Sequence, residues 1–302
     1  MIIRRATQLC AAVLTTGLAA VGCASAGAGT PQAGRTATKQ SSPFAPATSK
    51  HSAASGHGRQ RPSGHGSQTP SGASRAARPL AGKVIGIDPG HNGLNHTDPA
   101  YIDRQIWNGR EMENCNTTGT QTASGYTEAQ FNWNVAGYLA SYLRKDGARI
   151  VLTRKNNDGV GPCVNLRSTM LNHTDVAIDI HADGGPTWGR GFTVLEPVAD
   201  GPNDKVIGSS IRFGGYVHAA FIADTPLRPA NYYGHNGYIF RDNLAGLNLT
   251  TVPKVLIECG NMPNSADAAL LTSPTVQRQI ARALEAAIIR FLVGHWTKGT
   301  TR

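Results

Sequence analysis

The sequence predicts a single α/β domain with a mainly parallel sheet that helices cover on both sides. Short apolar runs typical of buried strands alternate with segments whose apolar residues recur at helical spacing, and this alternation is typical of parallel sheets. The composition also changes sharply near residue 80, where a polar N-terminal quarter gives way to a folded part. We therefore predict one domain over residues 81–296, followed by a short tail at 297–302.

Residues 1–26 are predicted to be an export signal. Arg4 and Arg5 form its charged start, and the apolar stretch from Cys10 to Cys23 is too short to span a bilayer but suits a signal peptide. The sequence Ala24-Ser25-Ala26 suits an ordinary signal peptidase, whereas the four residues that end at Cys23 resemble a bacterial lipobox. We therefore expect the protein in the cell envelope or a periplasm-like space. It would be either free there or anchored by a lipid on Cys23.

Residues 27–80 are predicted to be a disordered basic linker. Small and polar residues dominate this segment, and Phe44 is its only aromatic residue, so it cannot form a core. Nine of the 29 Lys and Arg residues lie in the first 80 positions, which contain no Asp or Glu. Such a tether could lie against an anionic envelope surface. The remaining 20 basic residues nearly balance the 19 acidic ones, so nucleic acid is not expected as a partner.

The first predicted strand, Lys83–Asp88, presents a histidine at its carboxyl end. Pro89 ends the strand because proline has no N–H for the hydrogen-bond ladder, and His91 follows at the turn. Open α/β sheets bind their ligands at this edge. The next segment, 92–125, is rich in Asn, Gly and Thr, and we predict an irregular loop that is functional or pinned.

A helix is predicted to open at Glu128 and to close at Gly147. Its apolar residues fall at i, i+3, i+4 and i+7, and glycine is common just after a helix. The helix at 203–221 is expected to be interrupted by Gly214-Gly215, and the sequence of 225–248 shows no pattern. The remaining predicted elements are strands at 148–153, 176–181, 191–195 and 254–258, and helices at 163–172 and around Ile280, Leu284, Ile288 and Phe291.

The cysteines of the folded part fit an exported protein. Cys115 and Cys163 lie in Asn-, Gly- and Pro-rich loop sequence, where an oxidising compartment would allow them to form a disulfide. Cys259 follows an apolar run and is predicted to be a buried free thiol. Because the chain has no Cys-x-x-Cys pair, we expect neither a thiolate metal site nor a redox dithiol.

Three predicted strands end in ionisable residues, namely His91, His181 and Glu258. Parallel strands end at the same edge of a sheet, so these side chains can converge with Glu128 at its helix start. Each has a simpler explanation alone, as a loop residue or a partner of the helix dipole. Together, two histidines and one glutamate form the ligand set of a catalytic zinc site, with a second carboxylate as general base. This argument leaves open which glutamate is the ligand and which is the base.

The motifs around these residues resemble a known enzyme family. The sequences Ile-Asp-Pro-Gly-His91, Ile-His181-Ala-Asp and Val-Leu-Ile-Glu258-x-Gly-Asn, with the helix-opening Glu128, resemble the zinc-dependent N-acetylmuramoyl-L-alanine amidases of the AmiA/AmiB/AmiC type, in their actinobacterial branch. The resemblance covers about residues 81–293. Supporting matches are Leu152-Thr-Arg154, Arg167 and Asn264.

The resemblance implies that His91, Glu128 and His181 hold one Zn²⁺ per chain and that Glu258 is the catalytic base. It also implies a mixed, mostly parallel sheet of about six strands. The implied reaction is hydrolysis of the amide between N-acetylmuramic acid and L-alanine in peptidoglycan or muropeptides. We separately expect the protein to be a monomer. The chain departs from the common pattern at Asp183, at Asn261 and in the longer segment between His91 and Glu128, which leaves the preferred stem peptide or glycan open.

Two other classes of function share part of this signal. A zinc exopeptidase or deacetylase could use the same ligands, although the strand followed by Asp-Pro-Gly-His favours the amidase. A non-catalytic wall-binding protein would keep the fold but would not need the metal ligands. The presence of all four residues favours an enzyme.

Overall fold

The computed structural model describes residues 78–294, so the predicted signal, the lipobox, most of the linker and the tail lie outside the described residues. Leu80, at the end of the predicted linker, is fully buried, and its N–H donates a 2.9 Å hydrogen bond to the Asp146 carbonyl. The folded part thus includes a few residues before 81. Within 78–294, no helix has both the length and the apolar character needed to cross a membrane.

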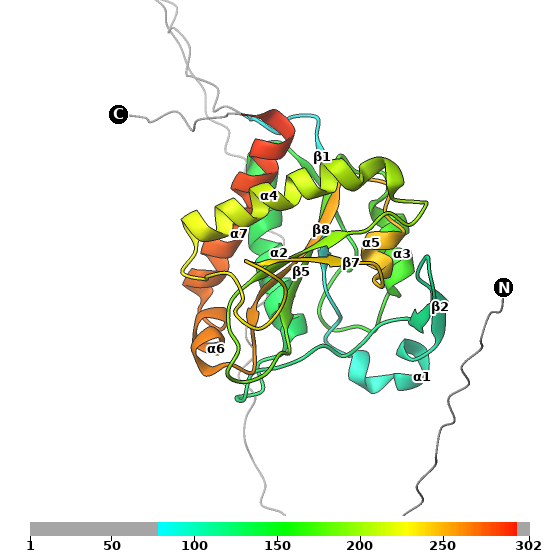
Figure 1. The fold of residues 1–302 in the computed structure, drawn as a ribbon, viewed down its shortest axis with the longest axis vertical. Helices are drawn as coiled ribbons and strands as arrows, with labels where there is room; N and C mark the ends of the chain where they lie inside the picture. The colour runs from blue at the N-terminus through cyan, green and yellow to red at the C-terminus, as the bar shows by residue number, and fades with distance from the viewer. Residues whose placement is uncertain (1–77, 295–302) are drawn as a thin grey trace, which may run out of the picture. The chain divides into compact units, whose positions relative to one another are not determined.

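A six-stranded sheet forms the centre of the domain (Figure 1). Its strands, in spatial order, are β4 (Arg149–Leu152), β1 (Val84–Pro89), β5 (Val176–Asp183), β8 (Lys254–Asn261), β6 (Thr193–Pro197) and β7 (Tyr238–Arg241). The first four strands are parallel, β6 is antiparallel to β8, and β7 is parallel to β6. The prediction of a mixed, mostly parallel sheet of about six strands is confirmed.

Helices cover both faces of the sheet, as predicted (Figure 1). One face packs against α2 (Glu128–Lys145), α4 (Ile207–Asp224) and α7 (Pro274–Val293). The other face is covered by the shorter helices α3 (Val164–Leu171) and α5 (Ala245–Asn248). Helix α6 (Ser265–Leu271) follows β8 and contacts it. The start of α2 is capped by Thr127, whose hydroxyl accepts a hydrogen bond from the Gln130 N–H, and this fixes where Glu128 lies.

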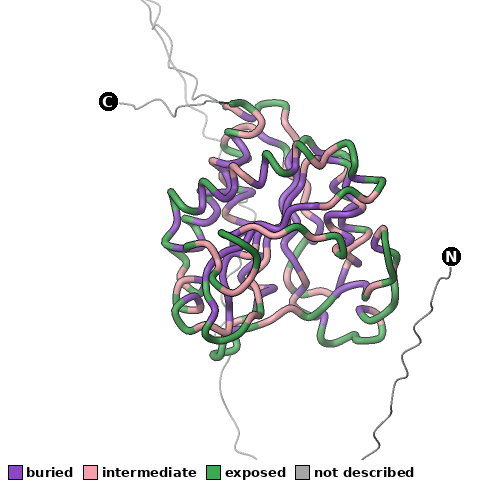
Figure 2. The backbone as a smooth tube through the Cα atoms, viewed as in Figure 1, coloured by how far each residue is buried: buried purple, intermediate pink, exposed green. Residues whose placement is uncertain are grey.

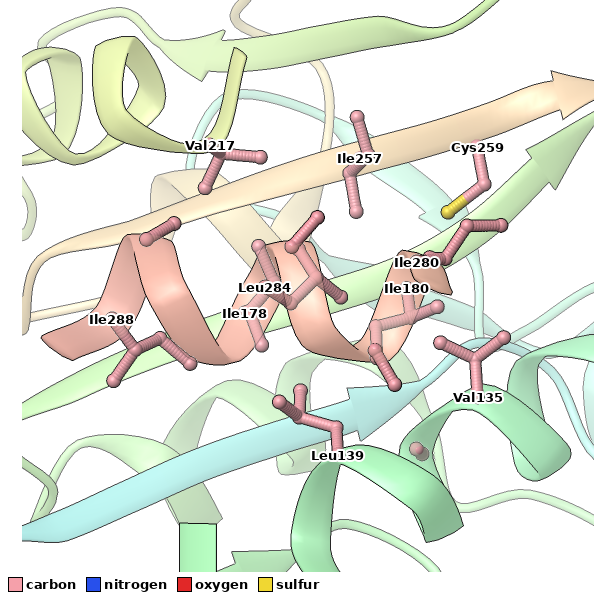
Figure 3. Close-up of a cluster of buried hydrophobic side chains, with 14 of the residues drawn as sticks. Val135, Leu139, Ile178, Ile180, Val217, Ile257, Cys259, Ile280, Leu284 and Ile288 are labelled. Carbon is pink, nitrogen blue, oxygen red and sulfur yellow. The ribbon is translucent and has the colours of Figure 1, made fainter. Parts of the chain in front are cut away.

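The face under α2, α4 and α7 forms the main hydrophobic core. Side chains alternate along a strand, so every second residue of β5, such as Ile178 and Ile180, points to this side. Figure 3 shows Ile280, Leu284 and Ile288 of α7 lying against them. Figure 2 shows that the buried backbone follows the strands and the inner sides of these helices.

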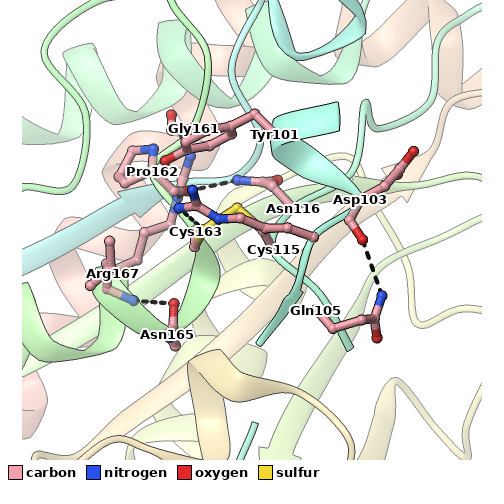
Figure 4. Close-up of a disulfide and its surroundings, with 12 residues drawn as sticks. Tyr101, Asp103, Gln105, Cys115, Asn116, Gly161, Pro162, Cys163, Asn165 and Arg167 are labelled. Carbon is pink, nitrogen blue, oxygen red and sulfur yellow. Dashed lines mark hydrogen bonds between the residues drawn. A yellow bond between two sulfur atoms is a disulfide. The ribbon is translucent and has the colours of Figure 1, made fainter. Parts of the chain in front are cut away.

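The segment between β1 and α2 contains more regular structure than we predicted. It holds a 3₁₀ turn, a one-turn helix and a two-stranded hairpin, namely η1 (Asn95–Thr97), α1 (Pro99–Ile102), β2 (Gln105–Trp107) and β3 (Met112–Asn114). The predicted disulfide between Cys115 and Cys163 is present and joins the end of this hairpin to the start of α3 (Figure 4). Beside it, the Asn116 side-chain amide donates a 2.8 Å hydrogen bond to the Pro162 carbonyl. The segment is therefore pinned, as expected. Cys259 is free and buried, also as expected.

Two expectations about the later elements are wrong. Helix α4 runs without a break through Gly214-Gly215, preceded by the short turn η2 (Asp204–Val206). A Cβ on Gly214 would lie 2.4 Å from Oε1 of Glu196, so this glycine lets α4 pack closely on β6. The unassigned segment 225–248 contains β7 and α5, which are both only four residues long and too short to produce a period.

Candidate metal centre and active site

The structure brings His91, Glu128 and His181 together at the carboxyl edge of the sheet. His91 follows β1, Glu128 opens α2 and His181 lies on β5. Oε1 of Glu128 lies 3.1 Å from Nε2 of His91 and 2.8 Å from Nδ1 of His181. One potential ligand atom from each residue falls within 4.8 Å of the other two, close enough to bind one ion. Of the two candidate glutamates, Glu128 is the one that lies between the histidines.

Hydrogen bonding orients the imidazole of His91. Its Nδ1 lies 3.1 Å from the carbonyl oxygen of Thr117. The hydroxyl oxygen of Thr117 lies at the same distance of 3.1 Å from Nδ1, and these contacts hold the ring with Nε2 directed towards Glu128. Metal-binding histidines are usually held in this way by a second partner. The backbone of His91 has a φ of 60°, a conformation that non-glycine residues rarely adopt and that places the ring at the edge of the turn.

Two glycines make room for the histidine rings. A Cβ on Gly90 would lie 2.2 Å from Cε1 of His181, so any side chain at this position would displace the ring. A Cβ on Gly119 would lie 2.8 Å from both the Glu128 carboxylate and the His91 ring, and Gly119 has a φ of +74°. Both positions require glycine because the backbone forms the wall of the site.

Arg167 of α3 holds the turn that carries His91. Its Nη1 donates to Oδ1 of Asp88 at 2.6 Å and to the Pro89 carbonyl at 2.9 Å, and its Nη2 donates to the His91 carbonyl at 2.7 Å. Burial alone would raise the pKa of Asp88, but the charge of Arg167, aided by Lys254 and by a hydrogen bond from Thr153, lowers it to about 2. This ionised pair therefore fixes the backbone from which the imidazole extends.

Arg154, after β4, holds the same turn from the opposite side. Its Nε donates to the Pro89 carbonyl at 2.8 Å, and its Nη2 donates to the carbonyl oxygens of Gly90 and Ala129 at 3.4 and 2.8 Å. The turn after β1 is thus linked both to α3 and to the start of α2. Sequence analysis noted both arginines only as family matches, and the structure gives each a defined contact.

The Glu128 carboxylate is ionised within its buried site. Oε2 accepts a 3.0 Å hydrogen bond from the Thr120 N–H, and Oε1 accepts one of 3.3 Å from the Asn132 side chain. Burial raises the pKa of Glu128, but the charges and hydrogen bonds of His91 and His181 outweigh this and hold it well below its usual value. Burial is also the main cause that lowers the pKa of His181, which favours the neutral, ligand-competent imidazole.

Glu258 lies beside this cluster but outside it. On β8 it pairs in register with His181, which places both side chains on the same face of the sheet. Its Oε2 is buried and has no hydrogen-bond partner among the described residues. Burial raises the pKa of Glu258 well above its usual value, and the negative charges of Glu128 and Asp183 raise it further. The group can therefore hold a proton at a pH where an ordinary carboxyl would not.

Asp183 and Asn261, which sequence analysis singled out, hold segments next to the site. Oδ2 of Asp183 accepts a 2.6 Å hydrogen bond from the Tyr232 hydroxyl. The Asn261 side chain donates 2.7 Å hydrogen bonds to the carbonyls of Pro186 and Gly189 and so holds the loop between β5 and β6. The predicted Asn264 caps α6, because its side chain accepts from two N–H groups of the first turn.

Several residues of the site were missed by sequence analysis. Asn132 lies four residues after Glu128 on the same side of α2, and this spacing could have revealed it. Thr117, Gly119 and Thr120 lie in a segment without periodicity, which gave no such signal. A cavity beside the cluster extends over β8 and β6 towards β7, and its lining includes His91, Glu128, His181, Asp183, Leu195, Arg241, Leu244, Leu256 and Glu258.

The comparisons with known proteins agree with this geometry. The family model described as N-acetylmuramoyl-L-alanine amidase matches residues 85–290. An N-acetylmuramoyl-L-alanine amidase of Mycobacterium tuberculosis is 40% identical over 233 residues, which covers 76% of this chain and 93% of the relative. The crystal structure of the amidase Ami1 from Mycobacterium smegmatis matches with a TM-score of 0.67 and 39% identity, over 72% of this chain and 99% of that chain. Apo Ami1 from Mycobacterium abscessus matches with a TM-score of 0.66 and 38% identity, over 70% and 100%. The chain therefore belongs to the N-acetylmuramoyl-L-alanine amidase family, in its actinobacterial branch.

Proposed function

We propose that this enzyme hydrolyses the amide between N-acetylmuramic acid and L-alanine in peptidoglycan, with one zinc ion held by His91, Glu128 and His181. Family membership supports the reaction. The observation that carries the zinc assignment is the convergence of two imidazole nitrogens and one carboxylate oxygen from three separate elements.

The donor set fits zinc in a catalytic site. Nitrogen and carboxylate ligands from three protein residues are typical of zinc sites that keep one position open for chemistry. The histidines are partly exposed towards the cavity, and Glu128 is held by further hydrogen bonds, as ligands usually are. A bound zinc ion would polarise the scissile carbonyl and lower the pKa of a water molecule towards neutrality.

We assign the role of general base to Glu258. Its carboxylate lies next to His181, and its Oε2 has no competing hydrogen-bond partner among residues 78–294. In this role it accepts a proton from the attacking water and then donates that proton to the nitrogen of the departing amine. A raised pKa of Glu258 suits these two proton transfers, because the carboxyl must hold the proton between them. Arg167 and Arg154 keep His91 in place throughout.

The rival functions have less support. A zinc exopeptidase or deacetylase could use the same three ligands, but the family match over most of the folded part favours the muramoyl amide. A wall-binding protein without activity would not need Glu258 beside the ligand cluster.

We further propose that the enzyme is exported and acts as a monomer in the cell envelope, either free or anchored through Cys23. The basic, acid-free N-terminal quarter supports retention at an anionic surface. Deleting residues 27–79 should leave turnover of soluble muropeptides nearly unchanged and should weaken binding to whole sacculi at low salt. Equal sacculus binding by both forms would contradict the proposed role of the linker.

The experiment that tests the reaction is product analysis. Purified sacculi are digested with the enzyme, and the products are identified by mass spectrometry. We expect free stem peptides with L-alanine at their amino end, together with glycan strands that carry intact lactyl groups. Loss of acetyl groups would indicate a deacetylase, and release of single amino acids would indicate an exopeptidase.

A further inference from the structure

Asp183, the last residue of β5, is an acidic residue in the lining of the catalytic cavity that the mechanism above does not use. Side chains alternate along β5, so Ala182 points into the hydrophobic core while His181 and Asp183 both point to the catalytic face. The carboxylate of Asp183 thus lies just beyond a proposed metal ligand, on the same strand and the same face of the sheet.

The protein holds the Asp183 carboxylate in one orientation. Oδ1 accepts a 2.7 Å hydrogen bond from the Gly184 N–H, and Oδ2 accepts one of 2.6 Å from the Tyr232 hydroxyl. The ring of Tyr232 is itself confined between Gly185 and Gly189, where an added Cβ would lie 2.3 and 2.5 Å from it. The carboxylate is therefore preorganised before any ligand arrives.

The charge of Asp183 is not neutralised by the protein. Both of its hydrogen bonds come from neutral groups, and within residues 78–294 no basic side chain lies within ion-pair distance of it, whereas Glu128 contacts two histidines. Each carboxylate oxygen has a second lone pair. The side chain can therefore accept further hydrogen bonds from a positively charged group in the cavity, and such charge-assisted bonds are stronger than neutral ones.

The strand register places Asp183 diagonally across from Glu258. His181 lies directly opposite Glu258 on β8, and Asp183 follows His181 by two residues, next to a bulge of β8 that brings Asn261 opposite it. Diagonal neighbours in a sheet lie about 7–8 Å apart, within reach of long side chains. The negative charge of Asp183 accordingly acts on Glu258 and helps to raise its pKa. This spacing leaves room for one nitrogen atom within hydrogen-bond distance of both carboxyl groups.

The proposed reaction creates a positive charge at such a nitrogen. Cleavage breaks the bond between the carbonyl carbon and the amide nitrogen, and one proton of the attacking water reaches that nitrogen through Glu258. The new muramoyl carboxylic acid releases the second proton and becomes a carboxylate. The pKa of an α-amino group is about 8, so near pH 7 the released amine takes up this proton and becomes an ammonium group.

We infer that Asp183 binds the α-ammonium group of the stem peptide that the reaction releases. This inference rests on the proposed function, because it uses the amidase product and the assignment of Glu258 as the base. Since Glu258 donates its proton to the departing nitrogen, that nitrogen lies beside Glu258 and within reach of the carboxylate diagonally opposite. Asp183 is thus a product-binding residue and takes no part in the proton transfers.

The test compares two tripeptides as inhibitors of the full-length enzyme acting on a soluble muropeptide. One is the stem tripeptide with its free amino group, and the other has a propionyl group in place of L-alanine and so lacks only the amine. At pH 7 the wild type should bind the free-amine tripeptide about 10- to 100-fold more tightly, as expected for hydrogen bonds between charged groups. Isothermal titration calorimetry measures the same two dissociation constants without turnover.

Asp183→Asn keeps the shape of the side chain but removes its charge. It should bind the free-amine tripeptide at least about 10-fold more weakly than the wild type does, and the propionyl tripeptide equally well. Tyr232→Phe, which keeps the ring but not the hydroxyl, should lose part of the preference. Asp224→Asn is the matched control and should keep the wild-type preference, because Asp224 is exposed at the end of α4, which packs on the opposite face of the sheet.

An equal affinity of the wild type and Asp183→Asn for the free-amine tripeptide would overturn the inference. So would a wild type that does not distinguish the two tripeptides. A loss of affinity for both tripeptides alike in Asp183→Asn would also overturn it, because that result indicates a structural role. Failure of the wild type to release the stem tripeptide from the muropeptide would instead count against the proposed function itself.

Discussion

The two faces of the central sheet use the same strands but hold different chemistry. On β5, Ile178 and Ile180 point into the apolar core under α2 and α7, while Asp179 and His181 point to the other side. β8 repeats this pattern, with Ile257 in the core and Glu258 opposite it in the cavity. Alternation of side chains thus separates a stabilising face from a catalytic face within single strands.

The polar face holds two buried pairs of oppositely charged residues. Lys254 and Asp179 are both buried and lie 2.9 Å apart, and Asp88 and Arg167 form a second buried pair at 2.6 Å. Burying a charge is costly, and removing one member of such a pair typically costs about 3–5 kcal/mol because the other is left alone. The apolar face supplies the free energy that allows the opposite face to hold these groups.

The largest effect is expected on the polar face, at the two glutamates. Glu258→Ala should keep its zinc, because His91, Glu128 and His181 remain, and should lose activity by roughly 10²–10⁴-fold, the usual contribution of a positioned general base. Glu128→Ala should lose zinc and activity together. Bound zinc is measured by elemental mass spectrometry, and activity by release of the stem peptide. A metal-free Glu258→Ala beside a zinc-loaded Glu128→Ala would reverse the two roles.

A change on the apolar face should affect stability without affecting chemistry. Leu284 of α7 is fully buried in the main core, so Leu284→Ala should lower the free energy of unfolding by about 2–5 kcal/mol. Its kcat/KM per folded molecule, and its zinc content, should stay at the wild-type level. Denaturant unfolding and assays at a temperature well below the transition measure both quantities. A parallel loss of activity would mean that the two faces are not separable.

Lowering the pH should reduce the stability of the protein through Asp88, which lies on the polar face. Its pKa falls from 3.8 to about 2 on folding, so its contribution to stability is present above pH 3.8 and is lost as the pH falls through 2. This contribution is about 2 kcal/mol, from the shift in pKa. Unfolding measured at pH 4 and pH 2 should show this loss in the wild type and in Leu284→Ala alike. Asp88→Asn should lose less stability between pH 4 and pH 2 than the wild type does. An equal loss in the variant and the wild type would exclude Asp88 as the source of the pH dependence.

The smallest effect is expected at the two glycines of α4, which differ in their surroundings. A Cβ on Gly215 would meet nothing within 4 Å, so Gly215→Ala should stabilise the protein by about 0.5–1 kcal/mol, the usual gain from replacing a glycine within a helix. Gly214→Ala should destabilise it, because the new Cβ would meet Glu196 at 2.4 Å. The two variants are compared by thermal unfolding. Equal shifts would show that α4 does not pack against β6 as closely as described.

The residues that sequence analysis predicted best lie where a strand or helix begins or ends. His91 and His181 lie at the ends of predicted strands, and Glu128 opens a helix whose start is marked by Thr127. These positions follow from local patterns, because the edge of a parallel sheet collects whatever side chains end its strands. The sequence alone left the roles of Glu128 and Glu258 open, since choosing between them requires distances across the sheet.

Other features depend on contacts between distant segments, which leave no local pattern. Strand β7 is only four residues long and lies at the edge of the sheet. An edge strand is less buried than a central one, so its sequence need not form an apolar run. Gly214 resembled a helix break in the sequence. The residue that explains the glycine, Glu196, lies close to it in space but on another element. The same applies to Arg167, whose contact with the His91 carbonyl spans 76 positions in the sequence.

The place of β8 in the sheet sets the order in which the active site can form during synthesis. β8 is the last strand in the chain, yet it lies between β5 and β6. Until β8 is inserted, Glu258 is absent from the site and the pair formed by β6 and β7 has no neighbouring strand to join. A chain that crosses a membrane N-terminus first would therefore complete its catalytic machinery only after nearly the whole domain has emerged. For an enzyme exported as proposed above, the topology would delay the wall-degrading activity until translocation is almost finished.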